Sequence, residues 1–320
     1  MAIPGRSDIQ LRPRVLAAVR LRDASGKHPS FRLTAPGNDA TLRLGLREGP
    51  GMNDANITRS IELDRDGIGL RAARHMERVF RKLTAGYGGE SKDDYFRWIT
   101  REPHPLGNVV FQSVESDAAS AREAVEPLLA EDLPSAVLFP MGLSADAANS
   151  LVAAGFSDSP SIPAMAVDIE RLPPTRLPGG YSFTRVTAGR QGEGWAETLA
   201  VGYGLPIGLA RRLSPAVIGA DMADDARTQF FAVLHDEHIV ATSMLFLDDG
   251  LAGIYSVATL QDERGKGIGG YATAQPLRAA HALGYRVGVL QSSQAGHSVY
   301  LGLGFIDVGE VPMFTRMPIR

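Results

Sequence analysis

One segment of eight residues limits the possible folds of this chain more than any other. The sequence ERGKGIGG, from Glu263 to Gly270, has four glycines and two cations between an apolar run and a long helical pattern. A loop that joins a strand to a helix exposes the first unpaired amides of the helix, where the helix dipole adds partial positive charge. Glycines let the backbone close around phosphate oxygens, and Arg264 and Lys266 add full charges. The segment predicts a site for a phosphate-bearing ligand, with an ordinary glycine-rich turn as the alternative.

Two well-known phosphate loops fit this segment poorly. A P-loop needs Ser or Thr after Gly-Lys, and Lys266 is followed by Gly267, which excludes it. The dinucleotide pattern Gly-x-Gly-x-x-Gly is met by Gly265, Gly267 and Gly270, but no acidic residue follows before Asp307, although a ribose-binding carboxylate is needed about 20 residues on. A dinucleotide-binding protein is therefore a distant alternative.

The pattern of apolar residues around the loop predicts an α+β (mixed α/β) fold. Residues 228–260 read as three strands joined by tight turns at HDEH and DDG, which makes an antiparallel meander. Pro276 lies inside the helix expected after the loop and predicts a kink. In the first half, a helical stripe at 70–83 precedes an aromatic segment, Tyr95 to Ile99, that is also expected to be helical.

The chain divides into three expected regions. Glu170 to Phe183 holds three prolines and two glycines and is the best domain boundary, placed near Leu172. Residues 1–51, with eight Arg and one Lys against four acids, are expected to be a flexible extension or the product of a misassigned start, since Met52 is a plausible initiator. We expect one domain at 52–172 and a second at 173–320.

An internal echo links the two expected domains. AGFSDSPSIPAM, from Ala154, and LGFIDVGEVPMF, from Leu303, share Gly-Phe followed by a branched aliphatic residue and Pro at the same offset, 149 residues apart. Because this shift equals one domain length, we interpret it as a tandem duplication. The same shift places VESDAASA where the second copy has ERGKGIGG. The first copy therefore lacks the glycine loop.

The composition of the chain argues against nucleic-acid and membrane partners. The net charge is −3, which gives no basic excess for nucleic acid. The sequence has no cysteine, and no apolar run approaches the length of a membrane helix, so we expect a soluble, cytoplasmic protein without a membrane or nucleic-acid partner. His235 and His238 flank two acids, but their spacing across a turn does not aim both rings at one point, so no metal is expected.

A third pattern, Arg-x-x-Gly-x-Gly, is met by Arg264, Gly267 and Gly269 directly after the strand GIYSVATL. With the strand order, the strand VLQSS and the helix SVYLGLGF, it resembles the pyrophosphate loop of the Gcn5-related N-acetyltransferases (GNAT family) over residues 181–316. The resemblance implies the GNAT acyl-CoA N-acyltransferase fold. With the internal echo, it implies two tandem copies, of which the first is degenerate.

The family resemblance also implies roles for individual residues. Main-chain groups of Val257, Ala258 and Thr259 would pair with the pantetheine arm of acetyl-CoA like an added strand. The loop amides would wrap the CoA pyrophosphate, and Ser292 and Ser293 could bond cofactor or acceptor, with plain turn serines as the alternative. The implied pyrophosphate-binding residues are Arg264, Gly265, Lys266, Gly267, Ile268 and Gly269.

Tyr300 matches the family tyrosine that protonates the departing CoA thiolate, with a core tyrosine as the alternative. The implied reaction is direct attack of a primary amine, on a small molecule or a peptide, on the thioester. A CoA-binding sensor or interaction module without turnover is the alternative function. Gly202 to Leu213 is expected to shape the acceptor pocket, and His297 to begin the last helix or lie at the acceptor site. The base is unassigned, with Glu193, Glu197, Asp248, Asp249 and Glu310 as candidates. The protein is expected to be a monomer or a homodimer.

Overall fold

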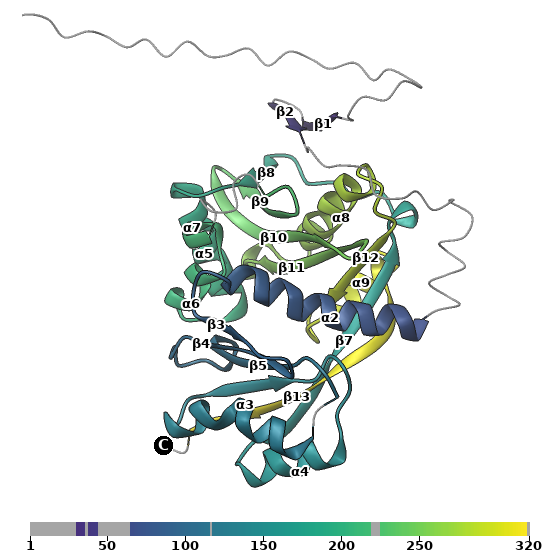
Figure 1. Ribbon diagram of the computed structural model, residues 1–320. Helices are drawn as coiled ribbons and strands as arrows, with labels where there is room; N and C mark the ends of the chain where they lie inside the picture. The colour runs from purple at the N-terminus through teal and green to yellow at the C-terminus, as the bar shows by residue number, and fades with distance from the viewer. Residues whose placement is uncertain (1–29, 36–37, 44–64, 116, 219–224, 319–320) are drawn as a thin grey trace, which may run out of the picture.

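The computed structural model describes residues 30–35, 38–43, 65–115, 117–218 and 225–318 (Figure 1). The expected extension, 1–51, lies mostly outside the described residues, and so does Met52. Within it, β1 (Ser30–Ala35) and β2 (Asn38–Arg43) pair antiparallel in a sheet of their own. No helix in the described ranges is both long and apolar enough to cross a membrane.

All other strands of the described residues form one sheet of 11 strands, in the order β3-β4-β5-β6-β13-β7-β12-β11-β10-β9-β8. The longer elements of the first half are α2 (Arg65–Thr84), β3 (Gly89–Ser91), β4 (Tyr95–Ile99), β5 (Asn108–Gln112), α3 (Ala118–Ala130), β6 (Ser135–Leu138), α4 (Ala145–Ala153) and β7 (Ser157–Asp168). Those of the second half are β8 (Tyr181–Val186), α5 (Arg190–Tyr203), α6 (Ile207–Arg212), α7 (Pro215–Ile218), β9 (Thr228–His235), β10 (His238–Asp248), β11 (Leu251–Thr259), α8 (Ile268–His281), β12 (Val287–Gln291), α9 (His297–Gly302) and β13 (Ile306–Arg316). Short 3-10 turns lie at η2 (Pro105–Gly107), η3 (Ile169–Arg171) and η4 (Gln261–Glu263).

The two halves repeat one succession of elements: three antiparallel strands, a helix, a parallel strand, a helix and a final strand. The chain turns in the same way after α4 and after α9. Gly155 and Gly304 have φ angles of 85° and 86°. The next amide, of Phe156 or Phe305, donates to a carbonyl five residues back at 3.0 or 3.1 Å. The two segments of the sequence echo thus have the same turn geometry, which confirms that they occupy equivalent positions in the two halves.

The last strands of the two halves are exchanged within the sheet. β7 pairs antiparallel with β12 of the second half, and β13 pairs antiparallel with β6 of the first half. β7 and β13 also pair with each other and so occupy the centre of the sheet (Figure 1). The two halves are therefore interleaved, and the proposed boundary at Leu172 follows directly on β7 and η3.

Helices cover both faces of this sheet, and alternate residues of the strands face different cores. Met244 and Phe246 of β10 lie in a core cluster with α2, α5 and α6, whereas Leu245 and Leu247 pack with α8 on the opposite side. In the first half, α3 and α4 cover the face opposite α2. α2 belongs to the first half in sequence but crosses β13, β7, β12 and β11 (Figure 1).

One expectation about local structure needs correction. The aromatic segment from Tyr95 is the strand β4, not a helix, because Tyr95 and Phe96 are both buried on opposite faces of the sheet, where a short apolar run resembles a buried helical segment. Pro276 lies inside α8, which runs from Ile268 to His281, and the predicted kink stays a prediction. α3 also holds an internal proline, Pro127, at the same 149-residue offset.

Candidate active site

A bulge in β11 shapes the site. Thr242 of β10 pairs with Ala258 and Met244 pairs with Tyr255, so β11 carries one extra residue between these positions. Ser256 takes a positive φ of 52°, and its carbonyl accepts a hydrogen bond from the Thr242 hydroxyl at 2.7 Å. A bulge of this kind turns the following backbone out of the regular ladder. The residues that follow it are Val257, Ala258 and Thr259, which sequence analysis selected for their main-chain groups.

β11 and β12 diverge next to this bulge. They pair in parallel only from Leu251 to Gly253, opposite Val287 to Val289. β12 then continues against β7, where Gln291 pairs with Ala164. The two strands therefore splay apart, and main-chain groups of β11 beyond Gly253 are not used by β12.

The glycine loop lies between β11 and α8. Gly265 and Gly267 have φ angles of 76° and 77°, a region that side chains with a Cβ rarely adopt. The first hydrogen bond of α8 runs from the Tyr271 amide to the Gly267 carbonyl at 3.0 Å. The helix itself therefore offers no acceptor to the amides of Ile268 and Gly269, which is the geometry of an anion-binding helix start.

The two cations of the loop are in different situations. Lys266 Nζ lies 2.8 Å from Glu263 Oε2, which also accepts from the Tyr181 hydroxyl at 2.6 Å. Hydrogen bonds from Lys266 and then Tyr181 lower the pKa of Glu263 to about 2, so its carboxylate balances the lysine charge. Arg264 donates from Nε to the Thr259 carbonyl at 3.1 Å and is exposed. The sequence shows both cations, but nothing in it reveals that Glu263 balances the charge of Lys266.

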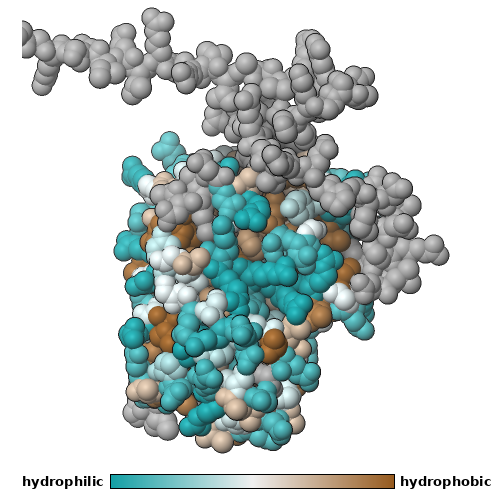
Figure 2. Space-filling model, viewed as in Figure 1, coloured by the Kyte–Doolittle hydropathy of each residue, from teal (hydrophilic) through white to brown (hydrophobic). Residues whose placement is uncertain are grey.

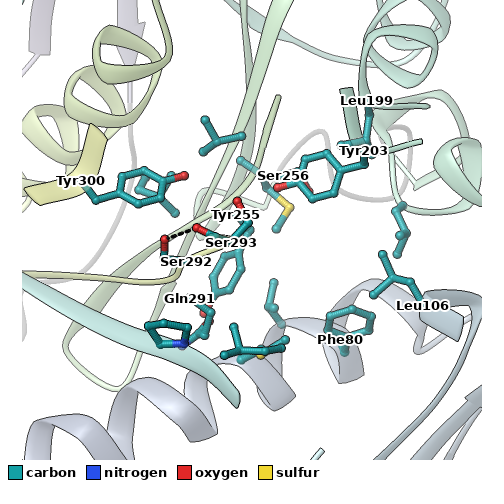
Figure 3. Close-up of a pocket in the computed structure, with 18 of the residues that line it drawn as sticks. Phe80, Leu106, Leu199, Tyr203, Tyr255, Ser256, Gln291, Ser292, Ser293 and Tyr300 are labelled. Atoms are coloured by element: carbon teal, nitrogen blue, oxygen red, sulfur yellow. Dashed lines mark hydrogen bonds between the residues drawn. The ribbon is translucent and has the colours of Figure 1, made fainter. Parts of the chain in front are cut away.

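A cavity of about 750 Å³ opens beside the splayed strands (Figure 3). Tyr300, Ser292 and Ser293 lie toward one end, and Phe80 and Leu106 lie across the cavity from them. α2 and the segment around η2, both from the first half, supply part of the wall. Ser256 and Val257 of β11 supply the wall at the bulge.

Comparison with known proteins places this arrangement in a family. Residues 208–305 match the acetyltransferase (GNAT) family. The matched segment, residues 208–305, is a GNAT domain. Similar solved structures include a GCN5-related N-acetyltransferase from Kribbella flavida, with a TM-score of 0.55 and 20% identity over 77% of this chain and 95% of that chain. Another, from Sphaerobacter thermophilus, has a TM-score of 0.52 and 16% identity over 70% of this chain and 76% of that chain. No curated protein sequence matches the chain.

Tyr300 of the GNAT domain lies on α9 and is 9% exposed. Its ring packs on Phe305 with centroids 5.9 Å apart, and its hydroxyl is directed into the cavity (Figure 3). Burial, and to a smaller degree the nearby Tyr203, raises the pKa of Tyr300 well above 10. The phenol therefore keeps its proton at neutral pH.

The two serines after β12 differ in burial. Ser292 is 1% exposed and donates from its hydroxyl to the Ser293 carbonyl at 2.8 Å (Figure 3). Ser293 is exposed, and its hydroxyl oxygen accepts from the Gly296 amide at 3.2 Å, which shapes the turn before α9. Ser293 thus has a structural contact in addition to its predicted contact with the cofactor.

Tyr203 is a site residue that sequence analysis did not single out. It ends α5 and faces Tyr300 across the cavity (Figure 3). Burial of its hydroxyl raises the pKa of Tyr203 to about 12, with an opposing hydrogen bond from the Val257 backbone, although 46% of the residue surface is exposed. A Cβ on the adjacent Gly202 would lie 2.6 Å from that of Ala258, so a glycine brings α5 this close to β11. The only sequence signal was that Tyr203 falls in the segment expected to shape the pocket.

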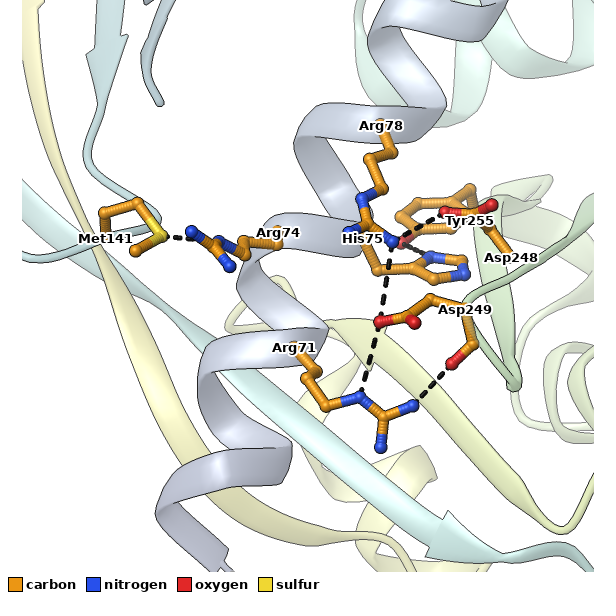
Figure 4. Close-up of polar contacts among 8 residues, drawn as sticks. All are labelled: Arg71, Arg74, His75, Arg78, Met141, Asp248, Asp249 and Tyr255. Carbon is orange, nitrogen blue, oxygen red and sulfur yellow. Dashed lines mark hydrogen bonds and ion pairs between the residues drawn. The ribbon is translucent and has the colours of Figure 1, made fainter. Parts of the chain in front are cut away.

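None of the five carboxylates suggested as a base lines the cavity. Glu193 pairs with Arg211 at 2.9 Å, and Glu197 and Glu310 are exposed. Asp248 and Asp249 pair with arginines of α2 (Figure 4). His297 does line the cavity, and its Nε2 lies 2.9 Å from Asp307 Oδ1. His235 and His238 have separate partners, the Glu263 carboxylate and the Asp236 carbonyl.

Proposed function

We propose that this chain is an N-acetyltransferase that moves the acetyl group of acetyl-CoA to a primary amine by direct attack. The observation that carries the proposal is the splay of β11 and β12 beyond Gly253, beside which lies a cavity that contains the Tyr300 hydroxyl. The match of residues 208–305 to the GNAT family supports it.

The residues around the splay fit acetyl-CoA. Backbone groups of Val257, Ala258 and Thr259 would bond the pantetheine arm, because the bulge and the splay leave this side of β11 without a partner strand. Amides from Arg264 to Gly269 would hold the pyrophosphate at the start of α8. Arg264 supplies the cation in this scheme, since the charge of Lys266 is balanced by Glu263. The Ser293 hydroxyl would add a polar contact.

Tyr300 would act as the general acid. The amine nitrogen bonds to the thioester carbonyl carbon, the carbon–sulfur bond breaks, and the nitrogen loses a proton. The departing thiolate takes the phenolic proton of Tyr300, and the proton released by the amine restores the phenol. Because the pKa of Tyr300 is raised above 10, the phenol carries its proton before the step and is in the form that can donate it.

The test compares binding with turnover. Calorimetry should show CoA binding to wild type and to Tyr300→Phe alike, whereas thiol release from acetyl-CoA should fall about 100-fold or more in the variant. Tyr285→Phe is the matched control, because Tyr285 packs against the same core cluster as Tyr300 but lies outside the cavity, and it should keep wild-type turnover. Unchanged turnover in Tyr300→Phe would remove the acid role, and failure of wild type to bind CoA would remove the proposal.

A CoA-binding module without turnover is the second candidate. The observation in its favour is that no Asp or Glu is among the described residues that line the cavity, so the site has no carboxylate base. CoA binding without thiol release on any primary amine would support the module over the enzyme.

A further inference from the structure

The wall of the cavity opposite the catalytic end is apolar. It consists of six side chains from α2, η2 and the region of α5 and α6: Met76, Phe80, Leu83, Leu106, Leu205 and Leu213. Hydroxyl and amide side chains gather instead on the β11 and β12 side, where Ser256, Ser292 and Gln291 lie (Figure 3). The cavity therefore has a polar end next to the predicted thioester and an apolar end away from it.

No Arg, Lys, Asp or Glu is among the lining residues that the structure describes. A charged substituent placed against the apolar wall would lose its hydration without gaining a partner, which disfavours its binding. An apolar substituent binds more tightly in proportion to the surface that it buries there. The same wall therefore rejects carboxylates, phosphates and second ammonium groups and favours hydrocarbon.

We propose that the acceptor is a small primary amine on an uncharged, apolar body, alkyl or arylalkyl, which enters the cavity as the neutral amine. This inference rests on the proposed acetyl transfer, which sets the orientation of the bound amine. The nitrogen lies toward Tyr300 and the apolar body lies toward Phe80 and Leu106. The volume of about 750 Å³ lies within the range of small-molecule pockets, and the thioester end of the cofactor must share it. The occupant is accordingly a small molecule.

Entry as the neutral amine also accounts for the missing carboxylate base. An ammonium ion has no anionic partner in the described lining, so the proton is left in solvent when the amine enters. The nitrogen lone pair is then free for attack without a carboxylate base among the described lining residues. The value of kcat/KM should therefore rise with pH up to the pKa of the free amine, which is about 10 for an alkylamine.

The apolar wall comes largely from the first half of the chain. Met76, Phe80 and Leu83 lie on α2 and Leu106 lies in η2, both before β7. The degenerate copy, which lacks the glycine loop, thus determines which acceptor body fits. Substitutions in the first half should alter the choice of amine without altering CoA binding.

Three six-carbon amines test the inference: hexylamine, 6-aminohexanoate and 1,6-diaminohexane, which differ only in an apolar, anionic or cationic far end. Calorimetry on CoA-saturated protein should give hexylamine at least a tenfold lower Kd than either charged analogue, and thiol release from acetyl-CoA should rank them alike. Equal or tighter binding of a charged analogue, or no binding of hexylamine, would overturn the inference.

A charge placed in the wall gives a second test. Leu106→Asp should raise the Kd of hexylamine at least tenfold. It should also raise the affinity of 1,6-diaminohexane relative to hexylamine, because the second ammonium meets the new carboxylate. Leu70→Asp is the control, because Leu70 is on α2 but is 41% exposed and outside the cavity, and it should change neither value. CoA binding measured on the same samples separates the two ideas. Loss of CoA binding with hexylamine still bound defeats the proposed function alone, whereas CoA binding and thiol release with preference for charged amines defeats the inference alone.

Discussion

His75 connects α2 to the floor of the cavity. Its Nδ1 lies 2.7 Å from the hydroxyl of Tyr255, a cavity residue, and the two rings stack with centroids 5.9 Å apart (Figure 4). The ring is 1% exposed and meets the edge of Phe246. Burial lowers the pKa of His75 to about 4, against the attraction of the nearby Asp248 carboxylate. His75 is therefore neutral in the folded protein at neutral pH.

This pKa makes stability sensitive to acid. Below pH 6.5 the unfolded chain binds a proton at His75 that the folded chain does not take up until about pH 4, so stability falls as the pH drops through this interval. At pH 5 the lowered pKa of His75 reduces the free energy of unfolding by about 2 kcal/mol. Urea unfolding should show that the free energy of unfolding of wild type falls between pH 7 and pH 5. The fall should be smaller by about this amount in His75→Gln, because glutamine does not titrate. An equal loss in both proteins would contradict it.

α2 is held on the sheet by close backbone packing and by ion pairs. A Cβ on Gly69 would clash with the Val308 carbonyl oxygen of β13. Arg78 pairs with Asp248 at 2.9 Å, and Arg71 pairs with Asp249 at 3.4 Å, at the turn between β10 and β11 (Figure 4). Hydrophilic side chains gather over the middle of this face, where α2 crosses it (Figure 2). Such exposed pairs contribute about 0–1 kcal/mol each, so packing at Gly69 dominates.

Gly69→Ala tests this packing. Alanine raises helix propensity by about 1 kcal/mol, but the clash should outweigh it and lower the free energy of unfolding by about 1–3 kcal/mol in total. Gly302→Ala on α9 is the matched control, because its Cβ would meet nothing within 4 Å and the variant should be stabilised by up to about 1 kcal/mol. Urea unfolding of both variants gives the comparison, and a stabilised Gly69→Ala would show that α2 is not docked this closely.

For the molecule as a whole, local sequence patterns predicted the order of helices and strands, but they did not predict which strands pair. The strand–glycine loop–helix order of the second half could be predicted because each element has its own signal, and the echo at Gly155 and Gly304 marked equivalent turns. The exchange of β7 and β13 could not, because nothing local in a strand specifies a partner on the other half of the chain. Tyr203 was missed for a similar reason, since only the packing of α5 on β11 brings it to the cavity.

The exchanged strands predict how the halves should behave when the chain is cut. The linker is the segment between β7 and β8. Across the centre of the sheet the order is β6, β13, β7 and β12, so strands that precede the linker alternate with strands that follow it. Gly179 and Gly180 in this linker are exposed, and a protease recognition sequence inserted between them should be cleavable in the folded protein.

After cleavage, the two pieces should co-elute at the volume of the intact chain in gel filtration, and they should separate only in denaturant, because three of the strand interfaces at the centre of the sheet join one piece to the other. The same protein left uncut sets the reference elution volume. Two halves that each formed a closed sheet of their own would separate at once in native buffer. Since α2 and η2 carry the apolar wall, separation would also remove the acceptor end of the cavity, so association and acceptor binding should be lost together as denaturant is added.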